Sequence, residues 1–397
     1  MDEIRIGLFG LGLRGLGWLR GLQRLDNYRI TAIGDIFPGL HQRGLDQLEN
    51  SNGVKTYADY DDFLANPDID AVALTVRCEQ QGAMAAMALE AGKHVNAEVP
   101  AAHTMEDCWR IVVATERSGL VYQLAEQQRY AGYFGGWQKL VKEGKLGHIV
   151  YFEGEYISYK MGEPASRKRY HQDWDTGEMV ASEDLHKYPN AKPNWRHQMP
   201  PAHYFVHDLS PILMILDDRV TTVTGMGTRR QSYAHPELKR ADIQVGLMKT
   251  TKDTVVRMAQ GATQMIAPNR DHHHFQMIGT KGSVESARSY DSPQKMWLAD
   301  SQMHGPSTID WRYERTDAPK EAVRSGHFGM DYYVHVAFRD AILHNKPLEF
   351  DVYKAMDTAA PAILTADSID RGSEPIEVPD FTPGKHRPHG TWPEVSR

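Results

Sequence analysis

Short apolar runs recur along the first third of the chain, and segments with helical periodicity separate them. The run at 70–76 is apolar almost throughout, as a strand covered on both faces of a sheet requires. This alternation predicts an α/β domain with a doubly wound, six-stranded Rossmann sheet, which we assign to residues 1–126. The expected strands are 4–9, 28–34, 54–57, 70–76, 93–98 and 121–125, and the expected helices begin at 16 and span 38–49, 59–64, 81–91 and 105–118.

The pattern changes after about residue 148, where closely spaced strands follow one another. This arrangement predicts an α+β C-terminal domain, residues 127–397, with a large and mostly antiparallel sheet. Residues 160–202 are polar and rich in Pro, Trp and Tyr, so we expect a long loop that acts as a lid or an oligomer arm. Helices at 330–345 and 352–368 are expected to return to the first domain. The expected strands are 149–157, 220–228, 243–248, 255–259, 275–278 and 283–285.

The first predicted strand leads into Gly10-x-Gly12-x-x-Gly15, and a helix follows. This is the dinucleotide-binding motif in its required context. The first glycine permits the tight turn, the second lets the backbone approach a pyrophosphate, and the third allows close helix packing. Asp35 ends the second strand, where a carboxylate can bind both ribose hydroxyls and repel a 2′-phosphate. The motif therefore predicts NAD rather than NADP as the cofactor.

Further cofactor contacts are expected at the carboxyl ends of the strands, since ligands of doubly wound sheets bind there. The segment Glu98-Val99-Pro100 follows the fifth strand, beside the expected nicotinamide, although a simple turn explains this proline equally well. The full predicted cofactor set is Gly10, Leu11, Gly12, Leu13, Arg14, Gly15, Asp35, Thr75, Glu98, Val99, Pro100 and Gln127.

The densest group of chemically capable side chains lies just before a predicted helix. It opens with Trp-Arg-His at 195–197, and Tyr204 and His207 then precede a helix expected near Asp208. A histidine titrates near neutrality and can take a sugar hydroxyl proton as hydride leaves, and a tyrosine can share such a proton. Glu126 follows the sixth strand at the same edge of the sheet, although an isolated glutamate is more often a surface residue.

No metal site is expected. His272, His273 and His274 are consecutive, and neighbouring residues of a strand point to opposite faces, so the three cannot converge on one ion. An exposed polar strand is predicted there instead. The two cysteines, Cys78 and Cys108, show neither a metal-binding spacing nor a disulfide framework.

Composition narrows the functional classes. The 397 residues are 41% hydrophobic and 24% charged, and a net charge of −7 gives no basic surface for nucleic acid or an anionic membrane. No apolar run approaches the ~20 residues that span a bilayer, and a strand beginning at residue 4 leaves no room for a signal peptide. We expect a cytoplasmic protein with a small-molecule substrate that binds neither nucleic acid nor membrane.

Nine short motifs are spread over nearly the whole chain. They are GLFGLGLRG (7–15), KHVNAEVPAAHTMEDCW (93–109), AEQQRY (125–130), GEYISYK (154–160), YFVHDLSP (204–211), GTKG (279–282), GHFGMDYYV (326–334), DVYKAMD (351–357) and VPDFTPG (378–384). Together and in this order they resemble the Gfo/Idh/MocA superfamily and, more narrowly, glycoside hydrolase family 109. Dehydrogenases of the superfamily usually carry Glu-Lys-Pro where this chain has Val99 in the middle position, and Glu-Val-Pro resembles the glycosidase branch.

The resemblance also implies roles for individual residues. The tyrosine and histidine of the glycosidase pattern match Tyr204 and His207, and its active-site Glu and Tyr match Glu126 and Tyr156. The expected substrate-binding residues are Arg196, Trp195, Tyr130 and Asp208. The chain departs from the branch at positions that shape the sugar pocket, where Phe205, Val206, Asp208 and Ser210 replace Pro, Thr and two Gly, and Gln127 replaces an Asn.

The implied reaction is a redox-neutral cleavage of a glycoside with tightly bound NAD. Hydride leaves the sugar C3 while His207 or Tyr204 removes the hydroxyl proton. The ketone acidifies the C2 proton, a nearby base removes that proton, and the oxygen at C1 is eliminated. Water then adds to the enone, and the hydride returns. A net NAD-dependent sugar or cyclitol dehydrogenase and a non-catalytic NAD-dependent sensor remain alternatives. A homodimer or homotetramer formed through the C-terminal sheet is expected.

Overall fold

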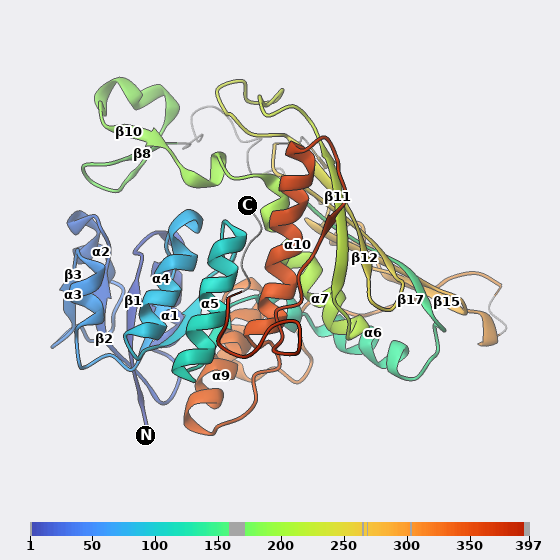
Figure 1. The fold of residues 1–397 in the computed structure, drawn as a ribbon, viewed down its shortest axis with the longest axis horizontal. Helices are drawn as coiled ribbons and strands as arrows, with labels where there is room; N and C mark the ends of the chain where they lie inside the picture. Colours follow the sequence, from blue (N-terminus) through green and yellow to red (C-terminus); the bar gives the residue numbers. More distant parts are fainter. Residues whose placement is uncertain (1, 159–170, 264–265, 268, 302–303, 393–397) are drawn as a thin grey trace.

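The computed structural model describes residues 2–158, 171–263, 266–267, 269–301 and 304–392. A six-stranded parallel sheet forms the N-terminal part, in the order β3-β2-β1-β4-β5-β6 (Figure 1). The predicted doubly wound sheet is therefore confirmed. Its strands are β1 (Ile4–Phe9), β2 (Tyr28–Gly34), β3 (Lys55–Tyr57), β4 (Ala71–Leu74), β5 (His94–Ala97) and β6 (Tyr122–Leu124).

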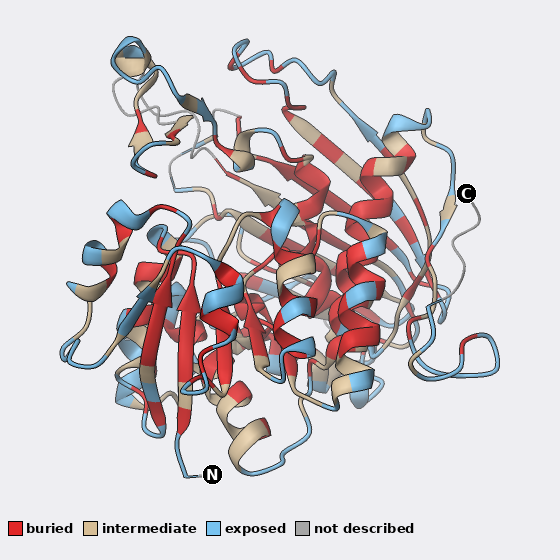
Figure 2. Cartoon of the chain, turned by 60° about the vertical axis from the view of Figure 1, so that its left-hand side comes forward, coloured by how far each residue is buried: buried red, intermediate tan, exposed pale blue. Residues whose placement is uncertain are grey.

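Strand β4 shows why these strands are apolar along their whole length. Val72 and Leu74 pack into a core with the helices α4 (Cys78–Glu90) and α5 (Met105–Ser118), whereas Ala71 and Ala73 pack on the opposite face with α1 (Leu13–Leu22). Both faces of the strand are covered, so neither set of alternating side chains meets water. Figure 2 shows buried positions concentrated along these strands and on the helices that face them.

Two predicted helix positions in this domain are wrong. Helix α1 begins at Leu13 rather than residue 16. The apolar pattern placed the start too late because Leu13 is 78% exposed and the buried apolar positions begin only at Leu16. The range 38–49 forms only the short helices η1 (Pro38–Leu40) and α2 (His41–Leu45), in a segment with two glycines, which have low helix propensity. The remaining helix of the domain is α3 (Tyr60–Leu64).

A nine-stranded sheet forms the core of the second domain, in the order β17-β16-β15-β14-β7-β13-β12-β11-β18. Every pair of neighbouring strands is antiparallel except β13 and β7, so the mostly antiparallel sheet is confirmed. The sequence missed the short strands at both edges. The nine are β7 (Ile149–Ile157), β11 (Val220–Gly227), β12 (Ile243–Thr250), β13 (Val255–Gly261), β14 (His273–Gly279), β15 (Gly282–Glu285), β16 (Gln294–Leu298), β17 (Ser307–Ile309) and β18 (Ile376–Glu377).

The segment predicted as an unstructured loop contains a small three-stranded sheet, in the order β10-β8-β9. Its strands are β8 (His171–Asp173), β9 (Met179–Val180) and β10 (Ala191–Pro193), and the start of the predicted loop, 160–170, lies outside the described residues. The segment contacts the first domain: the Trp174 ring packs against Phe37, and Glu178 forms an ion pair with Arg43. Its role as a lid or oligomer arm stays a prediction.

Two C-terminal helices join the domains. In α9 (Met330–Leu343), the backbone oxygens of Val334 and His335 accept hydrogen bonds from Gln123 and Tyr28 of the first sheet. Helix α10 (Val352–Asp370) lies between α5 and β11 (Figure 1). Both predicted helices therefore return to the first domain. The helices α6 (Gly132–Lys142) and α7 (Val206–Leu216) pack against one another and share the core of the large sheet.

One face of the large sheet is rich in ion pairs. Glu153 and Glu155 on β7 are each 9% exposed and pair with Arg257 of β13. Leu247 and Val255 lie exposed on neighbouring strands.

Pairing of two copies through this sheet stays a prediction, as does the division into domains at residue 126. Among the described residues, no helix is long and apolar enough to cross a bilayer.

Candidate functional site

The glycine motif forms the turn between β1 and α1, and each glycine is there for a distinct reason. Gly10 has a φ of +105°, and a Cβ on it would lie 2.5 Å from the carbonyl oxygen of Thr75. A Cβ on Gly15 would overlap the carbonyl oxygen of Gly10. Gly12 caps α1 and has open space where its Cβ would be. The loop thus packs tightly against the protein at Gly10 and Gly15 and is open at Gly12, which fits a pyrophosphate at the N-terminus of α1.

Asp35 lies at the end of β2, directly against this loop. Its carboxylate accepts hydrogen bonds from the backbone N–H of Leu11, at 2.7 Å, and of Phe37, at 3.0 Å. Burial raises the pKa of Asp35, although these two hydrogen bonds oppose the rise. Since each carboxylate oxygen can accept two hydrogen bonds, lone pairs remain for the ribose hydroxyls that the sequence assigns to this residue.

Arg14 and Glu98, both predicted cofactor residues, are brought together by the fold. Arg14 donates from Nε to Glu98 at 2.7 Å and from Nη1 to Asp331 of α9 at 2.7 Å. Burial opposes ionisation of Asp331, but its hydrogen bond with His327 and the charge of Arg14 hold the pKa of Asp331 well below its usual range. The sequence missed Asp331, because its link to the glycine loop exists only in the tertiary structure.

Val99 is 4% exposed and packs in the apolar core, with no lysine in its place. Thr75 donates a hydrogen bond to the oxygen of Gly10 at 2.7 Å, and Gln81 donates to the oxygen of Pro100 at 2.7 Å. Gln127 is the first residue of the short helix η2 (Gln127–Tyr130), which follows β6, and is 5% exposed. These predicted cofactor residues therefore line or support the carboxyl edge of the first sheet.

Glu126 and His207 form the first of two histidine–carboxylate pairs. Glu126 is 1% exposed, and its two oxygens lie 3.1 and 3.0 Å from Nδ1 of His207. The carboxylate also accepts the backbone N–H of Gln128 at 2.9 Å, which fixes its orientation. Helix α7 begins at Val206, so His207 lies in its first turn and does not precede it as predicted. The two predicted catalytic residues are thus in direct contact.

Asp208 and His273 form the second pair. Asp208 is 0% exposed, and its Oδ1 lies 2.6 Å from Nδ1 of His273 on β14. Burial would lower the pKa of His273, but the charge and hydrogen bond of Asp208 raise it above its ordinary value. Asp208 has no surface left for the predicted sugar contact and holds His273 instead.

The exposed polar strand predicted at the three histidines is wrong. His273 and His274 lie on a strand between β15 and β7, and His274 is 1% exposed. Its Nε2 lies 3.2 Å from Glu285 on the face opposite to His273. The alternation of side chains along the strand was predicted correctly, but burial of this strand follows from its neighbours in the sheet, which local sequence does not reveal.

Two tyrosines complete the cluster around the histidines. The Tyr156 ring stacks on His273 with centroids 4.3 Å apart and lies edge-on to His207 at 5.6 Å. Tyr204 stacks on His207 at 5.6 Å. Burial raises the pKa of both tyrosines, and the nearby charge of Arg196 opposes that rise. Both phenols therefore remain protonated at neutral pH and can donate hydrogen bonds.

The predicted substrate-binding residues divide into two groups. Arg196 and Trp195 lie in the short helix η5 (Trp195–His197), and the Arg196 guanidinium is 6.0 Å from the centre of the Tyr204 ring. Arg196 is exposed, so it can reach a ligand beside the tyrosines. Tyr130 instead stacks on Tyr333 of α9, at 5.8 Å.

Comparison with known families agrees with this architecture. Residues 4–126 match the model described as oxidoreductase family, NAD-binding Rossmann fold. The protein is therefore an NAD-binding enzyme of the Gfo/Idh/MocA type. Residues 137–388, more than half of the chain, match the model described as glycosyl hydrolase 109, C-terminal domain, so the chain belongs to the glycosyl hydrolase 109 family. Both are enzyme families, and the non-catalytic sensor gains no support.

Individual relatives extend the similarity over the whole chain. A glycosyl hydrolase family 109 protein of Shewanella baltica is 25% identical over 97% of this chain and 86% of its own length. A family 109 protein of Shewanella pealeana is 27% identical with the same coverage. Among solved structures, levoglucosan dehydrogenase in complex with NADH and L-sorbose has a TM-score of 0.72 at 18% identity, over 96% of this chain and 100% of that one. The last similarity concerns the fold alone.

Proposed function

We propose that this enzyme cleaves a sugar glycoside through reversible oxidation at C3, with no net oxidation of the substrate. The observation that carries the proposal is the pair of buried contacts, Glu126–His207 and Asp208–His273, on either side of Tyr156. Two acid–base groups suit the removal of the C3 hydroxyl proton and the protonation of the oxygen that leaves C1, and a further nearby base takes the C2 proton. The family 109 relatives and the apolar Val99 in place of a dehydrogenase lysine also support a glycosidase.

The glycine loop fits NAD, since the open space at Gly12 is bounded by the N-terminus of α1. The backbone N–H groups there would hold the pyrophosphate, Asp35 would hold the ribose hydroxyls, and the 98–100 segment would lie beside the nicotinamide. When bound, NAD supplies a hydride acceptor for the sugar and later a hydride donor.

His207 acts as the base for the C3 hydroxyl. Because the Glu126 carboxylate can only accept a hydrogen bond, it holds the tautomer in which Nδ1 carries the proton. Nε2 is then the nitrogen that accepts the hydroxyl proton, and the carboxylate stabilises the resulting imidazolium. The same nitrogen returns the proton when the hydroxyl is formed again. Tyr204, stacked on the ring, donates a hydrogen bond to the sugar and keeps the imidazole in place.

His273 serves as the acid for the oxygen that leaves C1. Its raised pKa keeps a larger share of the ring protonated at neutral pH, and Asp208 compensates that charge. Tyr156 lies between the two histidines and donates a hydrogen bond to the substrate. The exposed Arg196 binds sugar hydroxyls at the open side of the cluster.

A panel of aryl glycosides tests the proposal with the purified full-length enzyme and no added NAD. Multiple turnovers without net NADH are expected, and a reaction run in D2O should place deuterium at C2 of the released sugar, because that proton is removed after oxidation at C3. His207→Gln should abolish turnover. The matched control His344→Gln, at an exposed position, should keep it. Release of the aryl group without deuterium at C2 would contradict oxidation at C3.

A net sugar dehydrogenase is the second candidate, favoured by the likeness in fold to levoglucosan dehydrogenase. In that case a free sugar with added NAD yields stoichiometric NADH, and aryl glycosides are not cleaved. His207→Gln abolishes activity under either candidate, so the products decide between them.

A further inference from the structure

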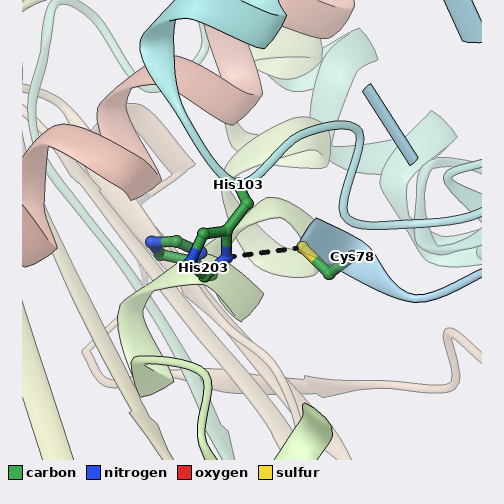
Figure 3. A group of neighbouring side chains, drawn as sticks. All are labelled: Cys78, His103 and His203. Carbon is green, nitrogen blue, oxygen red and sulfur yellow. Dashed lines mark hydrogen bonds between the residues drawn. The ribbon is translucent and has the colours of Figure 1, made fainter. Parts of the chain in front are cut away.

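Three potential metal ligands from separate segments of the chain lie close together (Figure 3). Cys78 is the first residue of α4, His103 lies in the loop between β5 and α5, and His203 belongs to the short helix η6 (Pro201–Phe205). Sγ of Cys78 and Nδ1 of His103 are 3.9 Å apart, and one ligand atom from each residue lies within 4.8 Å of the others.

We propose that Cys78, His103 and His203 bind a zinc ion that ties the cofactor domain to the second domain. Ligands in a tetrahedral zinc site lie about 3.5 Å apart, given bonds of about 2.0–2.3 Å. The separation of Cys78 Sγ and His103 Nδ1 is 3.9 Å and all three ligand atoms lie within 4.8 Å of one another, so side-chain rotations have to close the site around the ion. A thiolate and two imidazoles suit zinc, whereas magnesium and calcium prefer oxygen ligands.

His203 gives independent support. Its side chain is 4% exposed, and its Nδ1 has no hydrogen-bond partner among the residues that the structure describes. Because leaving a buried polar atom unpaired is unfavourable, such a group indicates a partner from outside the chain.

The surroundings allow a metal to enter. His103 and His203 line a pocket of about 340 Å³ that also includes Asp367. A water molecule from this pocket would complete four-coordination, and the Asp367 carboxylate interacts electrostatically with His103. Binding converts the Cys78 thiol to a thiolate, so one proton is released for each ion bound.

The cysteines carry no metal motif in the sequence, because the ligands come from three separate segments. Two of these segments belong to the first domain, and the third immediately precedes Tyr204. A bound ion would therefore cross-link the two domains next to the proposed catalytic tyrosine, and zinc should raise the melting temperature of the whole protein.

Cobalt substitution tests the site on the wild-type full-length protein. After treatment with a chelator, one equivalent of Co²⁺ should produce a thiolate-to-cobalt charge-transfer band, and Zn²⁺ should displace it. Cys78→Ser should abolish the band. Cys108→Ser is the matched control, because Cys108 is the other buried cysteine and lies outside the cluster, in α5. That variant should keep both the band and the stoichiometry.

Zinc affinity supplies a second readout. His203→Gln should weaken zinc binding by more than ~100-fold, since even residues that only orient a metal ligand contribute 10–100-fold. Zinc should raise the melting temperature of wild type and of Cys108→Ser but not of Cys78→Ser. The absence of a charge-transfer band in wild type, or a band retained by Cys78→Ser, would overturn the proposal. These readouts need no turnover, so failure of the proposed reaction would not affect them.

Discussion

Replacing Glu126 with glutamine tests whether the carboxylate sets the tautomer of His207. The amide oxygen can still accept the N–H of Gln128, which is 2.9 Å from the present carboxylate. The amide NH₂ then faces Nδ1 of His207, where a carboxylate oxygen now lies at about 3 Å. Because an NH₂ group donates and repels a protonated Nδ1, the substitution favours the tautomer in which Nδ1 is unprotonated and Nε2 carries the proton. The nitrogen required as a base is then blocked.

The expected loss can be estimated from the same change in a serine protease. There, converting the orienting aspartate to asparagine lowers kcat about 10⁴-fold, because the histidine adopts the wrong tautomer. Glu126 is 1% exposed, so water cannot easily replace the missing acceptor. We expect kcat to fall about 10²–10⁴-fold, or about 3–5 kcal/mol at 1.36 kcal/mol per factor of ten, with KM nearly unchanged.

The assay measures kcat and KM on a glycoside that wild type turns over, and thermal melting confirms that the variant folds. Glu143→Gln, at an exposed position after α6, is the matched control and should behave as wild type. If Glu126→Gln folds and keeps the wild-type kcat, then this carboxylate does not orient the base, and the assignment of His207 is refuted.

The remaining predictions concern the cofactor loop and its ionic support. Asp35→Ala should raise the Kd for NAD about 10–100-fold, because a charged hydrogen bond to the ribose is lost. It should also reduce the preference of the enzyme for NAD over NADP, and a fluorescence titration with each cofactor measures both effects. Gly15→Ala should lower the urea midpoint because its Cβ overlaps backbone, whereas Gly12→Ala should keep that midpoint but weaken NAD binding; a weakened fold in both would contradict the assigned roles. Folding lowers the pKa of Asp331, so its contribution to stability is present at neutral pH and is lost only as the pH falls below the ordinary range of an aspartate. Asp331→Asn should therefore lower the urea midpoint at pH 7 and flatten the fall of that midpoint below about pH 4.

The elements of the cofactor domain could be predicted because their signals are local. The continuous apolar run of β4 predicted a strand buried on both faces. The spacing of the glycines predicted a phosphate-binding turn. Contacts between functional side chains from distant segments could not be predicted from the sequence. Asp331 contacts Arg14 across 317 positions of sequence, and no periodicity links them. The burial of His274 depends on strands paired on both sides of it.

The sequence by itself determined the doubly wound sheet and the site for NAD, which follow from spacing and periodicity encoded within short segments. It also proposed Tyr204 and His207 as members of the candidate site, and the family resemblance added Glu126. Only the tertiary structure decided which groups act together. It joined Glu126 to His207, Asp208 to His273, and a cysteine to two histidines, because a contact between distant segments depends on how whole sheets and helices pack.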